Sequence, residues 1–338
     1  MSRTGSTGGW RRVAASWLRQ ALHLQLLIAL ESGESEILVG GQAVMEGVMM
    51  RAPHSYAVAV RRPDGSLATT TRRLVRPSER HRVWNWPLLR GLATLGQAMS
   101  LGVRALRFSG NQLLPDPEDA AAPAAEPTSW GMVASLAFSL LFFIAFYKFV
   151  PLLGATWMQR HWPVMGGQIA FNFADGVIRL VLFLLFLGGL ALLPDIRRVY
   201  QYHGAEHKVV FNYESGQPVD VDHARAFTTL HPRCGTSFMI VIMLIAMAMY
   251  MLIPAHTFWM RLLIRIALLP VIAGLSYEII RYGARHSRSV FALLARPGLW
   301  LQRVTTQEPA DDQLACSIRA LDEAMALERE QGGELVIA

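Results

Sequence analysis

Long apolar runs dominate the second half of the chain. Four of these runs approach the length of about 20 residues that a helix needs to cross a bilayer. They cover residues 132–153, 176–193, 236–253 and 266–282. The third run has no charged residue, the first carries Lys148 near one end, and the fourth contains Glu278. The pattern predicts a mainly α, polytopic helical membrane protein with about four transmembrane helices.

The region before the first apolar run shows shorter periods. Residues 56–74 alternate around a Pro-Asp-Gly turn and predict two strands, and the stretch ILVGGQAV just upstream is a candidate for a third. From Pro87 to Arg107, apolar residues recur at helical spacing. We interpret this stretch as an interfacial helix. A core-facing helix of a small cytoplasmic domain fits the same spacing equally well.

These patterns divide the chain into five parts. In order, they are a basic amphipathic N-terminal extension (1–36), a cytoplasmic β-hairpin region with an interfacial helix (37–110), a Pro/Ala-rich linker (111–130), a transmembrane bundle with a cytoplasmic metal-motif loop at about 194–235 (131–303), and a cytoplasmic C-terminal helix (304–338). The extension could equally be a poorly ordered segment. The C-terminal helix is expected to dock on the cytoplasmic domain, with a coiled-coil partner as the less favoured alternative.

Composition agrees with a membrane protein. The chain is 52% hydrophobic and has a formal net charge of +7, and Lys148 and Lys208 are its only lysines. A basic balance suits nucleic acid or anionic lipid, and the apolar runs favour lipid head groups as partners. No nucleic acid is expected. The two cysteines, Cys234 and Cys316, lie far apart and suggest no disulfide framework.

The arginines predict the orientation in the membrane. Residues 51–107 hold eleven arginines and residues 281–303 hold five, whereas residues 157–168 hold only Arg160. Because arginine accumulates on the cytoplasmic side, both termini are expected in the cytoplasm. The turn before the fourth run contains Arg261 and Arg265, which argue weakly the other way. The expected location is the bacterial inner membrane, as a multi-pass protein.

The stretch QYHGAEHKVVFNYESG carries the clearest chemistry. His203 and His207 are one helical turn apart, so both imidazoles can face one divalent ion such as zinc. Glu206 directly precedes the second histidine, which gives the order H-x-x-E-H. A carboxylate there can act as a general base for a metal-bound water. The alternative is a polar helix surface with two unrelated histidines.

Three residues compete to be the third ligand. His231 and Cys234 precede the third apolar run, and Glu278 lies near the end of the fourth, so all three are expected at the same membrane face as the histidine motif. An ionisable residue within a span is costly and suggests function, which places Glu278 slightly ahead. Each also has a structural interpretation: Glu278 can pair with a nearby arginine, Cys234 can be a small helix-start residue, and His231 can be a loop residue.

Two further acidic residues have less specific interpretations. Glu46 lies among apolar residues in GGQAVMEGVMMRAP, where a carboxylate needs a partner, and either the metal site or an arginine can supply one. Asp175 and Arg179 are four residues apart and are expected to form a structural pair.

Four motifs, in order, carry a resemblance to a known family. GGQAVMEGVMMR, YHGAEHKVVFNYESG, HPRCGTSF and SYEIIR resemble the bacterial YqhQ-like family, domain of unknown function 1385, over roughly residues 37–313. The resemblance implies a multi-spanning membrane protein described as a predicted metal-dependent enzyme. Residues 1–36 and the acidic linker look like additions to the family pattern.

Together these features predict a metal-dependent hydrolase at the cytoplasmic membrane face, with Glu206 as general base. Peptides, lipid-linked molecules and membrane-embedded segments all stay open as substrates. A structural metal site in a membrane scaffold is the second hypothesis, and a closed shell of four protein ligands would favour it. An ion- or proton-coupled transporter is the third and weakest hypothesis, because only one ionisable residue is expected well inside a span.

Overall fold

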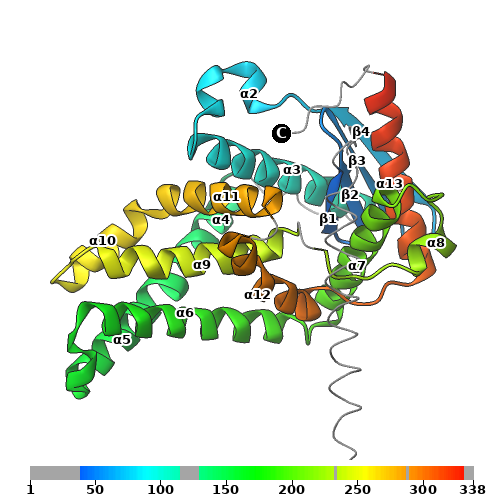
Figure 1. The fold of residues 1–338 in the computed structure, drawn as a ribbon. Coiled ribbons are helices and arrows are strands. Elements are labelled where there is room, and N and C mark those ends of the chain that lie inside the picture. The colour runs from blue at the N-terminus through cyan, green and yellow to red at the C-terminus, as the bar shows by residue number, and fades with distance from the viewer. Residues whose placement is uncertain (1–38, 115–128, 232–233, 287–288, 331–338) are drawn as a thin grey trace, which may run out of the picture.

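The computed structural model describes residues 39–114, 129–231, 234–286 and 289–330 (Figure 1). The N-terminal extension and most of the predicted linker lie outside these residues. The chain is mainly helical and contains one small antiparallel sheet. Figure 1 shows the long helices extending to one side of this sheet.

The sheet has four strands in the order β1-β2-β3-β4. The strands are β1 Gly40–Val44, β2 Gly47–Arg51, β3 Ser55–Arg61 and β4 Leu67–Arg73. The predicted hairpin is β3–β4, and its turn places Gly65 at a φ of 85°, which favours glycine. Strand β1 is the third predicted strand, whereas β2 was not predicted as a strand.

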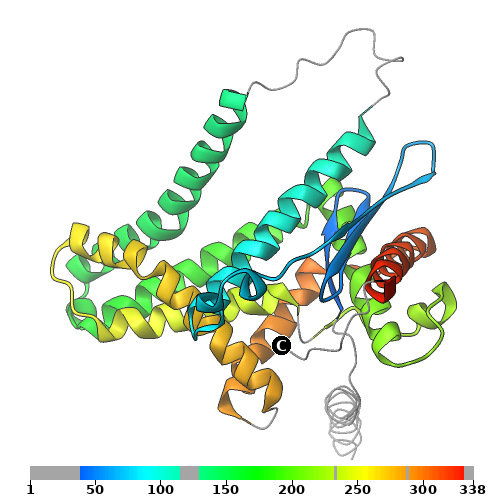
Figure 2. The same cartoon turned by 90° about the horizontal axis from the view of Figure 1, so that it is seen from above.

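The sheet is buried on both faces because successive side chains of a strand point to opposite sides. Helix α3, Leu89–Leu113, covers one face through Leu101 and Ala105. Helices α7, Pro194–Glu214, and α13, Asp311–Glu330, cover the other. Figure 2 shows the teal α3 and the red α13 on opposite sides of the blue strands. Helix α3 thus has one face on the core, as the alternative interpretation of this stretch held, and its contact with a membrane interface stays a prediction. The C-terminal helix docks on the sheet as expected.

Among the described residues, three helices are long and apolar enough to cross a membrane: Ala137–His161, Gln168–Leu190 and Gly235–Leu252. The first joins α4, Ser129–Ile144, to α5, Val150–His161, through a π-helical turn at Ala145–Phe149. The second is α6 and the third is α9. They match the first three predicted runs, although the first continues beyond residue 153.

The fourth predicted span is a bent pair and not one straight helix. Helix α10, Phe258–Ala267, meets α11, Leu269–Arg285, and the pair bends by 48°. Pro270 stands in the first turn of α11. A proline there has no N–H to donate and disfavours a continuous helix through the preceding turn.

Four short helices and one longer helix complete the described chain. The short ones are α2 Pro77–Arg80, η1 Arg82–Asn85, η3 Pro163–Gly166 and α8 Val221–Arg225, and the longer one is α12 Val290–Thr305. Helix α12 packs closely on α9, since a Cβ added to Gly298 would lie 2.4 Å from the Ser237 Cα atom. This contact brings the end of α12 to the start of α9.

The packing of the sheet restricts any transmembrane arrangement. Helix α3 precedes every apolar helix, α7 follows two of them, and α13 follows them all, yet all three cover one sheet. Elements that pack together lie on the same side of a bilayer, so an even number of crossings must separate them. If the apolar helices cross a membrane, the pairs available are α4–α5 with α6 before α7, and α9 with the bent α10–α11 pair after it. That arrangement would have four crossings.

We predict that a reporter enzyme active only outside the membrane will be inactive when fused after Ala338 of the full chain. The same reporter inserted between Gly166 and Gly167, in the exposed connection between α5 and α6, should be active because one crossing separates this site from the sheet. The measurement is reporter activity in whole cells. Equal activity at both positions would contradict the four-crossing arrangement.

Candidate metal centre

The histidine motif lies in the middle of α7. Pro194 and Asp195 favour the start of this helix, since proline is tolerated in the first turn and an acidic side chain interacts well with the helix dipole there. The region predicted as a metal-motif loop is therefore largely helical. The helix places His203 and His207 one turn apart, with their ring centroids 4.4 Å from each other.

Cys234 joins the two histidines. It caps the N-terminus of α9, and its Sγ atom lies 3.2 Å from His203 Nε2. One ligand atom from each of His203, His207 and Cys234 lies within 4.8 Å of the other two. Among the described residues, these three form the group of histidine, cysteine and acidic side chains that is close enough to hold one metal ion.

Backbone carbonyls set the protonation of both imidazoles. His203 Nδ1 is 2.8 Å from the Thr305 oxygen, and His207 Nδ1 is 2.5 Å from the Thr229 oxygen. A carbonyl only accepts hydrogen bonds, so each Nδ1 carries the proton and a neutral ring keeps the lone pair on Nε2. His207 Nε2 is buried and has no hydrogen-bond partner among the described residues. This is the tautomer that a metal ligand needs.

His231 lies beside the cluster and is held by its backbone. Its N–H donates to Gln302 Oε1 and its carbonyl accepts from Gln302 Nε2, both at 2.7 Å. Its ring centroid is 5.5 Å from that of His207, and its Nε2 is 3.7 Å from Glu214 Oε2. Burial lowers the pKa of His231 to about 4, so its ring is neutral near pH 7.

Glu206 directly precedes His207 on α7 and lies next to the sheet. Its side chain is buried, and Oε2 is 3.5 Å from His207 Nε2. Strand β1 passes directly over it, because a Cβ added to Gly41 would lie 2.7 Å from the Glu206 Cγ atom. The carboxylate therefore lies next to one candidate ligand atom, His207 Nε2.

The structure does not bring Glu278 to this cluster. Its carboxylate forms two hydrogen bonds with the Arg90 guanidinium, one of them 2.6 Å from Nε to Oε1, and accepts a third from Leu88 N. Arg90 belongs to α3. The sequence had instead suggested an arginine close to Glu278 in the chain as its partner. Glu278 therefore joins α3 to α11, which is the structural interpretation of this residue.

Glu46 also pairs with an arginine and not with the metal cluster. It stands at the β1–β2 turn with a φ of 52° and bonds to Arg198 Nε and NH2, each at 2.5 Å. The Tyr202 hydroxyl is 3.4 Å from the same carboxylate. The sequence allowed either the metal site or an arginine as the partner of Glu46, and the structure shows an arginine, Arg198. This ion pair joins the β1–β2 turn to the first turns of α7.

Gly204 permits the closest contact around the motif. A Cβ added there would lie 2.1 Å from the Gln307 carbonyl oxygen, and Gln307 N donates to the Tyr200 oxygen at 2.9 Å. The segment after α12 therefore lies directly on α7. This contact delivers the Thr305 carbonyl to His203. Sequence reasoning did not identify Thr229, Thr305 or Gln302, because a backbone carbonyl carries no sequence signal and the glutamine lies far along the chain.

Comparisons with known proteins bear on this arrangement. A family model described as a protein of unknown function, DUF1385, matches residues 86–327. The chain belongs to the DUF1385 family. It is also 35% identical over 298 residues to the uncharacterized protein YqhQ of Bacillus subtilis (strain 168), which covers 86% of this chain and 92% of that protein. No solved structure matches.

The DUF1385 match includes α7, α9 and α11 and begins after the four strands. His203, Glu206, His207 and Cys234 thus lie inside the family region. Neither description states an activity, and the metal-dependent chemistry that the motif resemblance implies stays a prediction.

We predict that Gly204→Ala will destabilise the protein by about 1–3 kcal/mol, the usual cost of overpacking a closed contact. Thermal unfolding of the detergent-purified protein, without added metal, measures the change. Gly96→Ala is the matched control, because an added Cβ at this helical glycine meets nothing within 4 Å. The control should unfold at the wild-type temperature or slightly higher. A Gly204→Ala protein as stable as the control would contradict the close contact.

Proposed function

We propose that this DUF1385 protein is a membrane-bound, metal-dependent hydrolase whose zinc-type ion is held by His203, His207 and Cys234. One observation carries the proposal. Both histidines donate Nδ1–H to backbone carbonyls, which leaves both Nε2 lone pairs available at the Cys234 thiol. Carbonyl partners of this kind commonly orient metal-bound imidazoles.

The residues present fit zinc. Two imidazole nitrogens and one thiolate form a donor set that zinc prefers, and three protein ligands leave one coordination position for water. A bound zinc ion would supply Lewis-acid activation of that water. His203 and Cys234 are only partly buried, which leaves the cluster accessible from one side.

Glu206 is the residue we assign to proton transfer. Its carboxylate is 3.5 Å from His207 Nε2, so it lies next to the candidate ligand atoms. In this role it accepts a proton from the water and gives it to the leaving group. Gly41 keeps the side chain in place because no larger residue fits between β1 and the Glu206 stem.

A structural metal site is the second candidate, and a specific observation favours it. The His231 ring is buried and neutral, and its centroid is 5.5 Å from that of His207, so it is the candidate for a fourth protein ligand. A closed shell of four protein ligands is typical of structural zinc. Such a site would join α7 to the start of α9.

The cellular setting belongs to the same proposal. Three or four apolar helices are available to cross a membrane. The arginine distribution of the sequence favours the bacterial inner membrane, with the sheet, the metal cluster and both termini in the cytoplasm. Anionic lipid head groups would then border the basic segments on that side.

We predict that the detergent-purified wild-type protein will bind about one zinc ion per chain and that Cys234→Ser will lower its zinc affinity by about tenfold or more. Glu278→Gln is the matched control and should keep full occupancy, because Glu278 pairs with Arg90. Glu206→Gln should also keep the metal. Elemental analysis after dialysis against a chelator measures all four proteins. Loss of zinc in Glu278→Gln with retention in Cys234→Ser would contradict the ligand assignment.

Cobalt substitution separates the catalytic from the structural site. A cobalt ion bound by Cys234 should give a thiolate absorption band that Cys234→Ser lacks. If one position holds water, added azide should shift the visible spectrum of the wild-type protein. A spectrum that azide leaves unchanged in the wild type but shifts in His231→Ala would favour the closed, structural site.

A further inference from the structure

A second polar cluster lies within the apolar helices, at the end of the bundle far from the metal centre. It contains Asp175 and Arg179 of α6, Arg265 of α10 and Tyr250 of α9, all of them buried. Helix α9 begins at the metal cluster and reaches Tyr250 16 residues after Cys234, so the two sites are about 24 Å apart along its axis. Figure 1 shows this end of the bundle near α5 and α10.

One carboxylate serves both buried arginines. Asp175 Oδ2 is 2.5 Å from Arg179 NH2 and 3.3 Å from Arg265 NH2. The expected Asp175–Arg179 pair is therefore present but shared. A single negative charge cannot neutralise two guanidinium groups, so this part of the cluster already has an excess of positive charge.

One more guanidinium group increases this excess. Arg261 donates to the Ala255 carbonyl and the Gln159 side chain, and it forms no ion pair with a carboxylate in the part of the chain that the structure describes. Lys148 is half-buried and donates to the Tyr250 hydroxyl at 3.3 Å. Three guanidinium groups and one carboxylate thus lie among helices that are otherwise apolar.

Aromatic rings offset only part of this charge. The Arg265 guanidinium lies 5.0 Å from the Tyr250 ring centroid, and that of Arg261 lies 3.8 Å from the Phe171 centroid. Such contacts stabilise a cation by much less than a carboxylate does at close range. Excess positive charge in a low-dielectric region is unfavourable unless an anion binds there.

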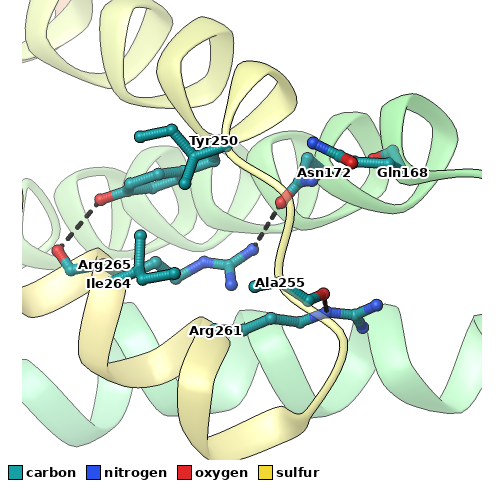
Figure 3. A pocket seen from close by; sticks show the side chains of 8 residues that line it. Gln168, Asn172, Tyr250, Ala255, Arg261, Ile264 and Arg265 are labelled. Carbon is teal, nitrogen blue, oxygen red and sulfur yellow. Dashed lines mark hydrogen bonds between the residues drawn. The ribbon is translucent and has the colours of Figure 1, made fainter.

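A small cavity opens beside Arg261 and Arg265 (Figure 3). Its other polar lining residues are Tyr250, Gln168 and Asn172. Arg265 is 2% exposed, and its Nε atom is buried with no hydrogen-bond partner among the described residues. Figure 3 shows both guanidinium groups extending toward the segment around Ala255.

We propose that this cavity binds a phosphate-type oxyanion, either the phosphate of a lipid head group or free phosphate. Guanidinium groups present parallel N–H donors that match the oxygens of phosphate. The side-chain amides of Gln168 and Asn172 each have a second N–H besides the one that they donate to a backbone carbonyl. Arg261 and Arg265 are the primary ligands. Asn172 positions Arg265, because it accepts from Arg265 NH2 at 2.9 Å. The site stands at the opposite end of the bundle from the metal cluster and does not depend on metal binding.

Binding of inorganic phosphate to the delipidated, detergent-purified full chain tests this site. Sodium phosphate should raise the unfolding temperature saturably, whereas sodium chloride at matched ionic strength should not. Arg261→Gln should weaken the apparent phosphate affinity by about tenfold or more, since it removes a charged donor. Arg261 is chosen because it pairs with no carboxylate, so the Asp175 pairs remain. Arg160→Gln, an exposed arginine on α5, is the matched control and should bind like the wild type.

A lipid arm identifies the source of the phosphate. Short-chain phosphatidylglycerol, with the phosphate-free diacylglycerol as control, is titrated into the same proteins. Tighter binding of the phospholipid than of inorganic phosphate, lost in Arg261→Gln, assigns the site to a lipid head group. Binding of inorganic phosphate alone assigns it to a soluble anion. Failure of both ligands to bind, or equal binding by Arg261→Gln and Arg160→Gln, overturns the proposal and leaves an internal charge network.

Discussion

The close approach of two backbone segments to α7 is the constraint on which the metal cluster depends. The chain around Gln307 lies against Gly204, and strand β1 lies against Glu206 at Gly41. Neither approach is compatible with a side chain at the glycine. The first brings the Thr305 carbonyl to His203, and the second confines the only carboxylate of the motif. The packing of the backbone therefore fixes the position of the carbonyl group, and the His203 side chain is oriented by its hydrogen bond to that carbonyl.

Much of the local structure could be predicted from the sequence. The spacing of His203 and His207 gives one helical face, the Pro-Asp-Gly turn gives the β3–β4 hairpin, and the apolar runs give the long helices. These features depend on residues that are close together in the sequence, and the spacing of apolar and polar residues therefore predicts them. The bend before α11 depends on a single proline, but a run of apolar residues across it looks continuous.

The choice of partners could not be predicted, because it depends on which distant segments meet. Glu278 has arginines nearby in its own helix, yet its partner Arg90 is 188 residues away. The sequence placed Glu278 slightly ahead of Cys234 as the third ligand. The packing of α11 on α3 and the contact of Cys234 with His203 reverse that order. Every residue has a backbone carbonyl, so the sequence cannot show which carbonyls set the histidine tautomers.

The buried charges show the same limit for the apolar helices. Lys148, Asp175, Arg179 and Arg265 each stand near the expected end or edge of an apolar run, where a charge can reach water. Considered individually, these four residues did not predict a polar cluster between the apolar helices. The fold instead gathers them around Tyr250. The number of charges in each apolar helix therefore does not predict a buried polar cluster when several helices contribute one or two charged residues each to the same place.

The cover of the sheet by α13 has a consequence for biosynthesis. The buried hydroxyl of Ser55 donates to the carbonyl of Ala324, 269 residues later. At a synthesis rate of about 5–20 residues per second, roughly 13–54 s pass between the two. During that time one apolar face of the sheet has no α13 against it. The sheet therefore reaches its fully covered state only after almost the whole described chain has been synthesised.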